Sequence, residues 1–437
     1  MLLDTKLLRQ KVLDLAIKGQ LVPQLDSEPA VEQLGQAPED VSFEIPKKWK
    51  WVSLRDVGTT ISGGTPKTSE TSYWGNDVSW ITPADLGKLT ENTIYSGARS
   101  ISYAGLKNSS ARLIPEGSVV YSSRAPIGHI AIAGKELTTN QGCKSIYPNT
   151  IVLSSKWTYF TLIARTKDIQ QRATGTTFKE ISAKGFAATL IPLPPLAEQK
   201  RIVAKVEELF AELDAIDKAY SELEQLGTLS KSKILDLAVK GQLVPQLDSE
   251  PAVERIGKAP EDVPFDIPEK WKFNYLGEIV SYGTTSQISF KDTNRDTWVL
   301  DLEDIEKGTS NLLVKNRGTA FKSNKVVFKR NDVLYSKLRP YLNKVIVADE
   351  DGVCTSEIIP IDTSTAKLPL IPDFLKNVLM SPYFVNYANM ASYGVKMPRL
   401  STKDAKKAVI PIPPLEEQKR IVAKVEELFA LIDAMKK

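Results

Sequence analysis

Two stretches of this chain, residues 52–190 and 274–409, carry side chains suited to binding phosphates and base edges. Residues 63–86 combine two adjacent glycines with Lys67, several hydroxyl groups and the aromatic rings of Tyr73, Trp74 and Trp80. Lysine and hydroxyl groups bind phosphate oxygens, and flat rings offer packing or stacking surfaces. For each tryptophan the alternative is a place in the hydrophobic core. The combination as a whole indicates a binding surface.

Each stretch also contains a strand-like run that leads into an arginine and a proline. Residues 117–133 (GSVVYSSRAPIGHIAIA) align with residues 331–348 (NDVLYSKLRPYLNKVIVA), which places Arg124 opposite Arg339. The runs are rich in β-branched residues, so we expect strands on both sides of each arginine. Both stretches close on a loop with glycine, GTTFKEIS in the first and GVKMPRLS in the second. Such loops on a sheet suit base-edge and phosphate contacts, although a solvated loop is the alternative for any single residue.

Catalytic and metal-binding side chains are scarce. His129 is the single histidine, which leaves no Ser–His–Asp or Cys–His nucleophile and too few ligands for zinc. The chain contains neither a G-x-x-x-x-G-K-[ST] phosphate loop nor a G-x-G-x-x-G fingerprint. Its two cysteines, Cys143 and Cys354, are typical of a reduced cytoplasmic protein. No apolar run approaches the ~18 residues of a membrane span, and the charged N-terminus does not read as a signal peptide. We infer a protein that binds and does not catalyse.

The net charge of +4 is unevenly distributed. Residues 47–190 contain 18 Lys and Arg against 9 Asp and Glu, and residues 269–409 contain 21 against 16. These two stretches therefore carry +9 and +5, and the rest of the chain carries −10. Basic side chains that contact phosphates release condensed counterions, so a basic excess on separate domains favours nucleic-acid binding. A solvated basic surface is the alternative.

The elements that must position these stretches occur twice. Residues 11–51 and 233–273 are identical at 32 of 41 positions, with an offset of 222. Residues 191–215 and 410–434 are identical at 21 of 25 positions, with an offset of 219. The stretches between these blocks barely resemble each other. We infer a fixed frame with internal two-fold symmetry that carries two different binding domains.

An a/d pattern of apolar residues begins at Leu196 and predicts a helix of about 40–45 residues. Prolines 194 and 195 mark its start, and Gly241 followed by Pro245 marks its end. Gly227 and Thr228, in the middle of the pattern, could kink the helix. The predicted seam consists of Ile202, Val206, Leu209, Leu213, Ile216, Tyr220 and Leu223, with Ile421, Val425, Leu428, Ile432 and Met435 in the second copy and Leu8, Val12 and Leu15 near the N-terminus.

The second copy of this helix starts at Pro414 and stops at Lys437, half-way along the pattern of the first. The missing half is found at the N-terminus. We expect residues 1–18 to dock end to end with residues 414–437, and this pair to run antiparallel to the central helix. The chain is then a circularly permuted repeat, opened inside one of two equivalent helices.

The loop that follows each helix, KGQLVPQLDSEPA, is identical in all thirteen positions at 18–30 and 240–252. It is polar and rich in turn-forming residues, so it does not read as core. Two explanations stay open, a local packing requirement or a surface that binds two copies of one partner. Duplication of an interface is typical of a frame that binds two identical subunits.

These blocks resemble the specificity subunits of type I restriction–modification systems. The resemblance covers essentially the whole chain. It rests on PLPPLAEQKRIVAKVEEL (192–209) and PIPPLEEQKRIVAKVEEL (411–428), on LAIKGQLVPQ and LAVKGQLVPQ, and on the segment 63–86, which is similar to the opening of target recognition domains in that family. The second variable domain departs from the pattern, reading SYGTTSQISF at 281–290.

The resemblance implies an α+β fold in which two globular mixed α/β target recognition domains are joined by a long antiparallel coiled coil. We expect an N-terminal repeat segment at 1–50, the first recognition domain at 51–190, a central repeat at 191–272, the second recognition domain at 273–409 and a C-terminal helix at 410–437.

The resemblance also implies a function. Each recognition domain would read one half of a bipartite, asymmetric double-stranded DNA site, and the coiled coil would set the spacer. Two modification subunits, S-adenosylmethionine-dependent adenine methyltransferases, would dock on the frame, and ATP-driven restriction subunits would join through them. The chain itself would be non-catalytic, bind no cofactor and no metal, contact no membrane and work in the cytoplasm. An autonomous DNA-binding regulator and a structural coiled-coil adaptor are the alternatives.

Within that function we expect DNA contacts from basic and hydroxyl side chains of both domains. The candidates are Lys67, Thr68, Ser123, Arg124, Lys144 and Lys179 in the first domain, and Lys337, Arg339, Lys344, Lys396 and Arg399 in the second.

Overall fold

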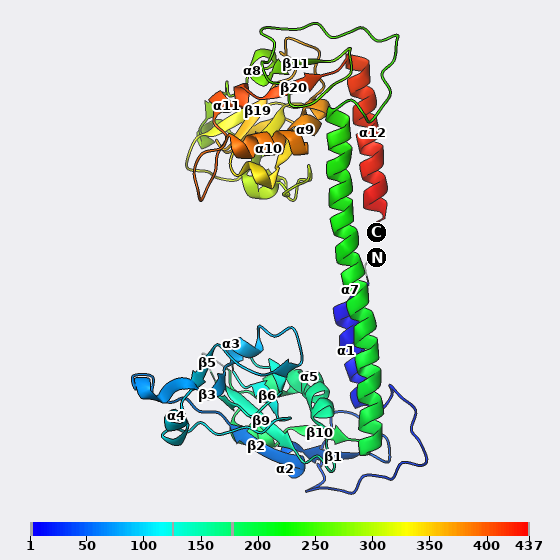
Figure 1. The fold of residues 1–437 in the computed structure, drawn as a ribbon, viewed down its shortest axis with the longest axis vertical. Helices are drawn as coiled ribbons and strands as arrows, with labels where there is room; N and C mark the ends of the chain where they lie inside the picture. Colours follow the sequence, from blue (N-terminus) through cyan, green and yellow to red (C-terminus); the bar gives the residue numbers. More distant parts are fainter. Residues whose placement is uncertain (1–2, 125, 176–178, 436–437) are drawn as a thin grey trace. The chain divides into compact units, whose positions relative to one another are not determined.

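The computed structural model describes residues 3–124, 126–175 and 179–435 (Figure 1). Residues 176–178 of the first closing loop, residue 125 next to Arg124, and the outermost residues of the predicted terminal helices lie outside this description. The chain forms two compact units, residues 1–219 and 220–437, which are treated separately below. Helix α7 (Leu196–Val239) contributes its first half to one unit and its second half to the other.

The first unit holds the first recognition domain. Its elements are α1 (Thr5–Ile17), β1 (Lys50–Ser53), α2 (Leu54–Val57), β2 (Gly58–Ser62), η1 (Thr71–Tyr73), β3 (Trp74–Ile81), α3 (Pro83–Leu86), β4 (Thr93–Ile94), β5 (Arg99–Ile101), α4 (Tyr103–Lys107), β6 (Val119–Ser122), β7 (Ile130–Ala133), β8 (Thr138–Thr139), β9 (Cys143–Pro148), α5 (Ser155–Arg172), α6 (Ala183–Ala187) and β10 (Leu190–Leu193). A five-stranded sheet has the order β2-β9-β6-β7-β4, and a three-stranded sheet has the order β5-β3-β8. The core joins β6, β9, α5 and the start of α7, with Trp157 fully buried at its centre.

The second unit holds the second recognition domain. Its elements are β11 (Lys272–Tyr275), α8 (Leu276–Ile279), β12 (Gln287–Ile288), η2 (Phe290–Asp292), β13 (Trp298–Leu300), η3 (Leu302–Asp304), β14 (Asn316–Arg317), β15 (Lys325–Phe328), β16 (Val333–Ser336), η4 (Pro340–Leu342), β17 (Val345–Val347), β18 (Gly352–Cys354), β19 (Ile358–Ile361), α9 (Pro372–Met380), α10 (Pro382–Met390), α11 (Thr402–Lys406), β20 (Val409–Ile412) and α12 (Leu415–Ala434). Its sheets have the orders β12-β15-β18-β13-β14 and β17-β16-β19. The predicted strand runs on either side of Arg124 and Arg339 therefore form β6 and β7, and β16 and β17.

Each recognition domain begins and ends on a pair of hydrogen-bonded strands. In the first unit β1 pairs antiparallel with β10, and in the second β11 pairs antiparallel with β20. The predicted domain boundaries fall within these strands. The chain therefore enters and leaves each domain on adjacent strands.

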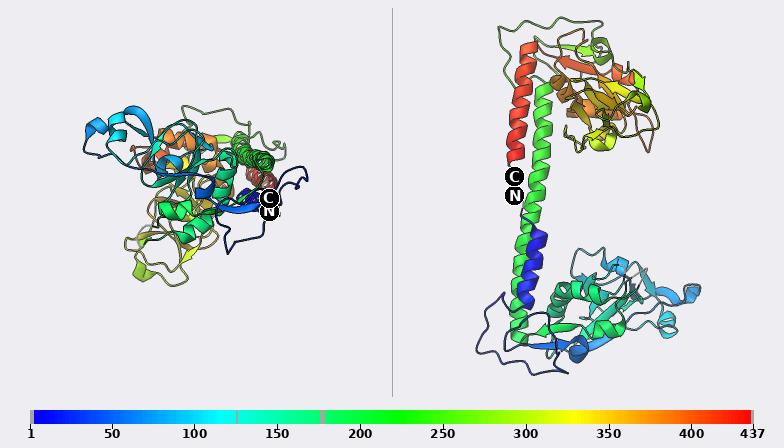
Figure 2. Two further views of the ribbon diagram at one scale, coloured as in Figure 1. Left: turned by 90° about the horizontal axis from the view of Figure 1, so that it is seen from below. Right: turned by 180° about the vertical axis from the view of Figure 1, so that it is seen from behind.

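The frame helices pair as antiparallel partners in both units (Figure 2). Helix α1 lies along the first half of α7, where Leu13 and Ile17 join the core with Ile202 and Val206. Helix α12 lies along the second half of α7 in the same way. Every residue of the predicted seam in these helices is buried or half-buried except Met435, which is exposed: buried are Ile202, Val206, Leu213, Ile421 and Val425, and half-buried are Leu8, Val12, Leu15, Leu209, Ile216, Tyr220, Leu223, Leu428 and Ile432.

The helix pairs repeat one polar contact at equivalent positions. Arg9 lies 5.3 Å from the Phe210 ring and pairs with Asp214 at 2.8 Å. With the sequence offsets, the equivalent Lys231 lies 5.0 Å from the Phe429 ring and pairs with Asp433 at 2.7 Å. The predicted equivalence of the N-terminal segment with the second half of α7 is therefore supported by side-chain contacts.

Helix α7 runs for 44 residues without a break. The kink considered at Gly227 does not break the helix, because α7 continues through this buried glycine. Gly241 ends the helix with φ +68°, as Gly19 does after α1, and these are left-handed conformations that favour glycine. None of the helices among the described residues is long and apolar enough to cross a membrane.

Candidate nucleic-acid interface

In the first recognition domain, backbone hydrogen bonds join four segments that are far apart in the sequence. These segments contain Gly63, Ser123, residues 140–143 and Ile181. The backbone N–H of Gly63 donates to the Cys143 carbonyl at 3.3 Å, and that of Ser123 donates to the Gly142 carbonyl at 2.8 Å. The N–H of Ile181, from the closing loop, donates to the Ser123 carbonyl at 3.0 Å. We call this arrangement the strand-exit junction, because it lies where β6 ends.

The glycine pair predicted to form a turn is required by close packing at this junction. A Cβ atom on Gly63 would lie 1.9 Å from the Asn140 carbonyl oxygen, and one on Gly64 would lie 2.3 Å from the Ser110 carbonyl carbon. The Trp80 Nε1 donates to the Gly64 carbonyl at 2.9 Å, and its ring is buried. The core alternative therefore holds for Trp80, and the turn carries Lys67 and Thr68 to the surface as exposed residues.

The predicted DNA-contacting residues of the first domain occupy three kinds of environment. Lys67, Thr68 and Lys179 are exposed, and Arg124 is half-buried with its backbone bridged to Glu180. Ser123 is fully buried, and its Oγ donates to the Gly142 carbonyl at 3.1 Å. In this structure Ser123 therefore contributes to the junction itself, and the DNA contact expected from it stays a prediction.

Lys144 is also largely buried, and its DNA contact likewise stays a prediction. Its side chain is only 9% exposed, and its Nζ donates to the Gln141 carbonyl at 2.9 Å and pairs with Glu180 at 3.5 Å. An ammonium group held in this way ties the loop to the closing segment. Its remaining influence on DNA would be the positive charge that it places beneath the surface.

The second recognition domain repeats the strand-exit junction with unrelated side chains. The N–H of Lys337 donates to the Glu357 carbonyl at 3.0 Å, and the N–H of Leu400 donates to the Lys337 carbonyl at 3.0 Å. These bonds match those of Ser123, Gly142 and Ile181. The backbone bridge between Leu338 and Arg399 matches the bridge between Arg124 and Glu180. The structure therefore places Leu338, and not Arg339, at the position of Arg124, one residue away from the sequence alignment.

Some charged side chains of the second junction form ion pairs or hydrogen bonds within the domain. Arg399 makes three hydrogen bonds to the Glu357 carboxylate, the shortest at 3.1 Å, and this ion pair raises the pKa of Arg399. Lys344 is half-buried and donates one hydrogen bond to the Leu302 carbonyl at 2.6 Å, which ties this side chain to the loop at 302. Lys396 is exposed, and Lys337 is half-buried.

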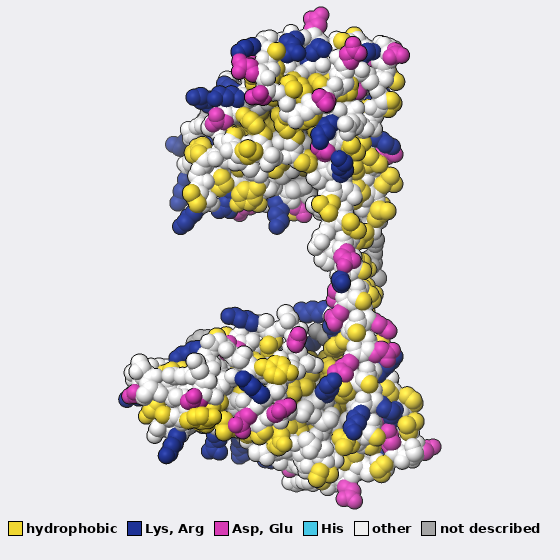
Figure 3. Space-filling view, in the orientation of Figure 1, with side chains coloured by type: hydrophobic (Ala, Val, Ile, Leu, Met, Phe, Trp, Pro, Cys, Tyr) yellow, Lys and Arg dark blue, Asp and Glu magenta, His cyan; other side chains and the backbone are white. Residues whose placement is uncertain are grey.

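Arg339 begins a strained turn directly after the second junction, between β16 and β17. Its φ is +49° and that of Asn343 is +48°, conformations that are uncommon for residues other than glycine. Between them, Tyr341 is 52% exposed. In the space-filling view, Lys and Arg side chains lie along the edge of this domain and are also scattered over the first domain (Figure 3). The junctions are thus loops on a rigid sheet that carry basic, polar and aromatic groups.

The two cysteines lie close to the junctions or their sheets and are buried. Burial raises the pKa of both Cys143 and Cys354 to about 12, so both thiols are protonated near neutral pH. Among the described residues, no group of three or more His, Cys, Asp or Glu side chains could hold a metal ion.

The duplicated loop at 18–30 is fastened to the start of α7 by buried carboxylates. The Arg201 guanidinium donates to Glu28 at 3.1 and 2.7 Å and to the Pro23 carbonyl at 3.1 Å. Glu198 accepts from the Trp49 Nε1 at 2.9 Å and from the Gln24 side chain. Burial raises the pKa of Glu198.

The second loop, 240–252, is fastened in the same way. Arg420 donates to Glu250 at 2.7 and 2.8 Å and to the Pro245 carbonyl at 2.9 Å. Burial likewise raises the pKa of Glu417, the equivalent of Glu198. We call each arginine–glutamate pair a loop latch. Packing therefore accounts for part of the identity between the two loops, and the first of the two open explanations is supported.

Residues 46–225 and 268–437 each match the family described as the type I restriction modification DNA specificity domain. The chain belongs to this family. Its two matched stretches coincide with the two copies found in the sequence, so each specificity-domain copy contains one recognition domain and the frame elements that follow it.

Curated relatives of this specificity-domain chain span nearly its whole length. The type I restriction enzyme MjaIX specificity subunit of Methanocaldococcus jannaschii is 27% identical over 404 residues, covering 89% of this chain and 88% of the relative. The EcoBI specificity subunit of Escherichia coli is 27% identical over 411 residues, covering 90% and 82%.

Solved structures share the fold of this specificity-domain chain. A chain from a study of assembly and conformational transition of the type I R-M system has a TM-score of 0.62 at 21% identity, covering 90% of this chain and 93% of that one. The HsdS subunit from Thermoanaerobacter tengcongensis has a TM-score of 0.53 at 20% identity, covering 90% and 92%. The predicted fold, two mixed α/β recognition domains on a repeated frame with a long helix, is confirmed.

Two exposed side chains of this specificity-domain chain were not among the residues predicted from the sequence to contact DNA. The exposed Arg99 on β5 stacks 3.5 Å from the centre of the Trp74 ring, and this pair adds a basic aromatic surface to the first domain. Tyr341 adds an exposed ring to the second. Spacing gives no signal for Arg99, because it meets Trp74 only through the pairing of β5 with β3.

Proposed function

We propose that this chain is the DNA-specificity subunit of a type I restriction–modification complex, in which each recognition domain reads one half of a bipartite, asymmetric duplex site. The observation that carries the proposal is the strand-exit junction. The same backbone geometry occurs in both domains, but it holds Arg124, Lys179 and Glu180 in one and Lys337, Leu338 and Arg399 in the other. Two readers of one design with different side chains suit a site with two different halves.

Helix α7 would set the spacer between the two half-sites. It runs without interruption between the two domains, from just after β10 to just before the loop that leads to β11. A straight helix of 44 residues extends about 66 Å at 1.5 Å per residue. A continuous helix that pairs with α1 in its first half and with α12 in its second half suits a fixed separation better than a flexible linker does.

The duplicated frame would bind two identical modification subunits, with restriction subunits joining through them. The loop latches explain why Glu28 and Glu250 are the same, but most identical loop residues are exposed, including Leu25 at 40% and Leu247 at 41%. Identical side chains that remain exposed support the second open explanation, a duplicated partner surface.

In this function the chain itself is non-catalytic, works in the cytoplasm, and leaves S-adenosylmethionine and ATP to its partners. The support lies in the chemistry of its own groups, since both thiols are buried and protonated and the one histidine, His129, lies against the Pro83 carbonyl at 3.2 Å.

Methylation mapping tests the proposal. DNA from cells that express this chain with its modification subunit should carry adenine methylation at one bipartite motif. Replacing residues 52–190 by the recognition domain of another relative should change one half of the motif and leave the other half and the spacer unchanged. Changes in both halves, or methylation without a motif, would refute the assignment of one domain to one half-site.

A further inference from the structure

Each recognition domain packs against a pair of aromatic rings that belongs to the frame. In the first copy the ring centres of Phe43 and Trp51 lie 4.8 Å apart. In the second copy the ring centres of the equivalent Phe265 and Phe273 lie 5.3 Å apart. A lysine of the frame lies 5.8 Å from the Phe43 ring and another lies 5.8 Å from the Phe265 ring. We call each ring pair an aromatic socket. The two sockets share this arrangement of two rings and a lysine.

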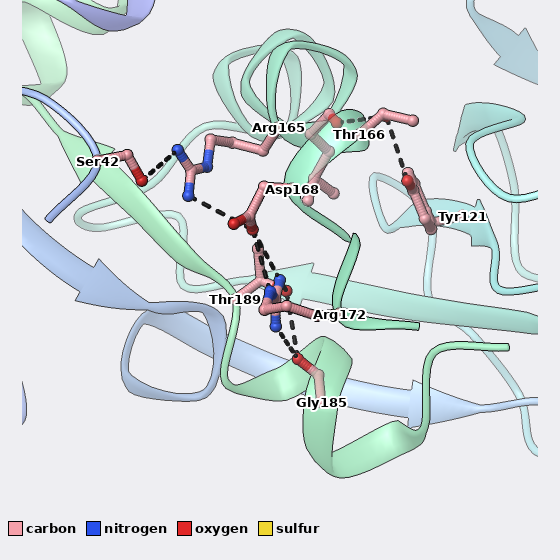
Figure 4. A network of polar contacts seen from close by, with 9 residues as sticks. Ser42, Tyr121, Arg165, Thr166, Asp168, Arg172, Gly185 and Thr189 are labelled. Atoms are coloured by element: carbon pink, nitrogen blue, oxygen red, sulfur yellow. Dashed lines mark hydrogen bonds and ion pairs between the residues drawn. The ribbon is translucent and has the colours of Figure 1, made fainter. Parts of the chain in front are cut away.

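The first socket is filled by Arg165, a residue of α5. Figure 4 shows this side chain beside Ser42. The guanidinium lies 5.9 Å from the Phe43 ring and 5.6 Å from the Trp51 ring, and its Nη1 donates to the Ser42 Oγ at 3.0 Å. The side chain is only 8% exposed. A charge buried to this degree needs its hydrogen-bond partners, so the Ser42 hydroxyl is part of the fit.

Arg165 is connected to the end of its own domain. It pairs with Asp168 at 3.4 Å, and Asp168 pairs with Arg172 at 3.0 Å. Arg172 in turn donates to the Gly185 carbonyl and the Thr189 hydroxyl at 3.0 and 2.9 Å (Figure 4). One network therefore runs from the frame loop, through α5, to the strand where the domain rejoins the frame.

In the second domain, tyrosines contact the socket and the end of the domain in place of arginines. The Tyr383 ring packs edge-on against Phe265 at 5.1 Å, and its hydroxyl donates to the Val409 carbonyl at 2.6 Å. The Tyr387 hydroxyl donates to the Asp404 carbonyl at 2.7 Å. With the offset of 219, Asp404 is the equivalent of Gly185, so the same carbonyl position receives an arginine in one domain and a tyrosine in the other.

The frame differs between its copies at the contact with these side chains. Only nine of the 41 positions in the first repeated block differ, and two of them are Ser42 against Pro264 and Trp51 against Phe273. The hydroxyl is present where an arginine needs an acceptor. Proline, which offers no side-chain acceptor, is present where the socket receives a tyrosine ring.

We propose that the aromatic sockets are keyed, so that the first accepts a recognition domain with an arginine clamp and the second accepts one with a tyrosine clamp. Arg165 and Tyr383 are then positioning residues, which fix the angle of each domain on the frame. The proposal rests on the proposed function, because a fixed angle matters only if each domain must reach its half-site at a set spacing.

The first test removes the Ser42 hydroxyl, which distinguishes the first socket from the second, by a single side-chain substitution. Ser42→Ala removes the acceptor that the frame offers to the buried guanidinium and leaves the pair with Asp168, and the matched control Pro264→Ala changes the equivalent position in the second copy. Binding of the full chain with its modification subunit is measured on the mapped duplex and on duplexes with a spacer one base pair shorter or longer. We expect S42A to reduce the preference for the native spacer about tenfold, and P264A to leave it unchanged.

The ratio between duplexes is the decisive quantity. A loss of folded protein lowers binding to all three duplexes equally and leaves the ratio unchanged, whereas a misplaced domain changes the ratio. An unchanged ratio in S42A would overturn the proposal. If the parent chain itself binds no bipartite duplex, the proposed function fails instead, and the two failures are distinguishable.

The second test moves a domain between sockets. One chimera carries residues 52–190 in place of 274–409, so that the first domain occupies both positions, and a second chimera also carries P264S and F273W. The probe is an inverted repeat of the first half-site with the native spacer. We expect the keyed chimera to bind at least tenfold more tightly than the unkeyed one. Equal affinity would refute keying, and if neither chimera folds, the ratio measured for S42A decides.

Discussion

The loop latches allow a well-controlled prediction because the same arginine–glutamate pair occurs twice in one chain. Replacing Arg201 by alanine leaves Glu28, whose side chain is 9% exposed, without a counter-charge, and replacing Arg420 does the same to Glu250 at 6% exposure. Lys205→Ala and Lys424→Ala are matched controls, since each removes a cation of the same helices that pairs with a neighbouring exposed glutamate.

The magnitude follows from the contacts. Each arginine makes two charged hydrogen bonds to its glutamate and one bond to a proline carbonyl. Breaking a fully buried pair costs about 3–5 kcal/mol, but the arginine side chains are 31% and 30% exposed, so water screens the pair and lowers the cost. We expect each variant to lose about 2 kcal/mol of local stability, a roughly 30-fold change in the opening equilibrium.

Hydrogen exchange measured peptide by peptide resolves the two latches. R201A should accelerate exchange of residues 18–30 by about 30-fold and leave residues 240–252 unchanged, and R420A should do the reverse. The double variant should show both effects without coupling, because distant sites add. The controls should exchange like the parent. With the proposed partners, each single variant should retain one modification subunit and the double variant neither, as measured by native mass spectrometry.

Two results would refute this reasoning. If R201A leaves residues 18–30 protected, the ion pair does not hold the loop. If both single variants still bind two modification subunits, the loops are latched for the frame alone and the partner surface lies elsewhere.

Three further predictions concern the junctions and the buried carboxylates. Arg124→Ala should relax base preference at one position of the first half-site, whereas Lys67→Ala should weaken binding to all duplexes alike and reduce the salt slope by about 1; anisotropy titrations at several salt concentrations distinguish the two. Glu357→Gln should free Arg399 and raise affinity for unrelated duplex severalfold at low salt, and an unchanged competition curve would contradict this. Burial raises the pKa of Glu198 above its ordinary 4.5, so its contribution to stability is complete below that value and is lost as the pH rises through the raised pKa. Glu198→Gln should therefore flatten the fall in unfolding free energy above pH 4.5 in urea titrations, and an unchanged slope would show that Glu198 does not titrate there.

Local pattern predicted the frame and the strands well. The a/d spacing located α7 to within a residue or two, because a helix seam is a regular function of position. The β-branched runs around Arg124 and Arg339 became strands for an equally local reason. The one-residue shift between Arg124 and Arg339 was not predictable, since only the bridges Arg124–Glu180 and Leu338–Arg399 define the true equivalence.

The sequence by itself determined that the chain is a duplicated frame with two unlike domains, because identity at fixed offsets is independent of structure. Only the tertiary structure decided which polar residues are available for contact. Ser123 and Lys144 were chosen as DNA contacts from their type, yet each is buried. Ser123 donates to the Gly142 carbonyl, 19 residues away, and Lys144, besides its bond to the nearby Gln141 carbonyl, pairs with Glu180, 36 residues away. Whether a hydroxyl or an ammonium group meets water or a carbonyl depends on the packing of distant segments, and that information is not present in any local window of sequence.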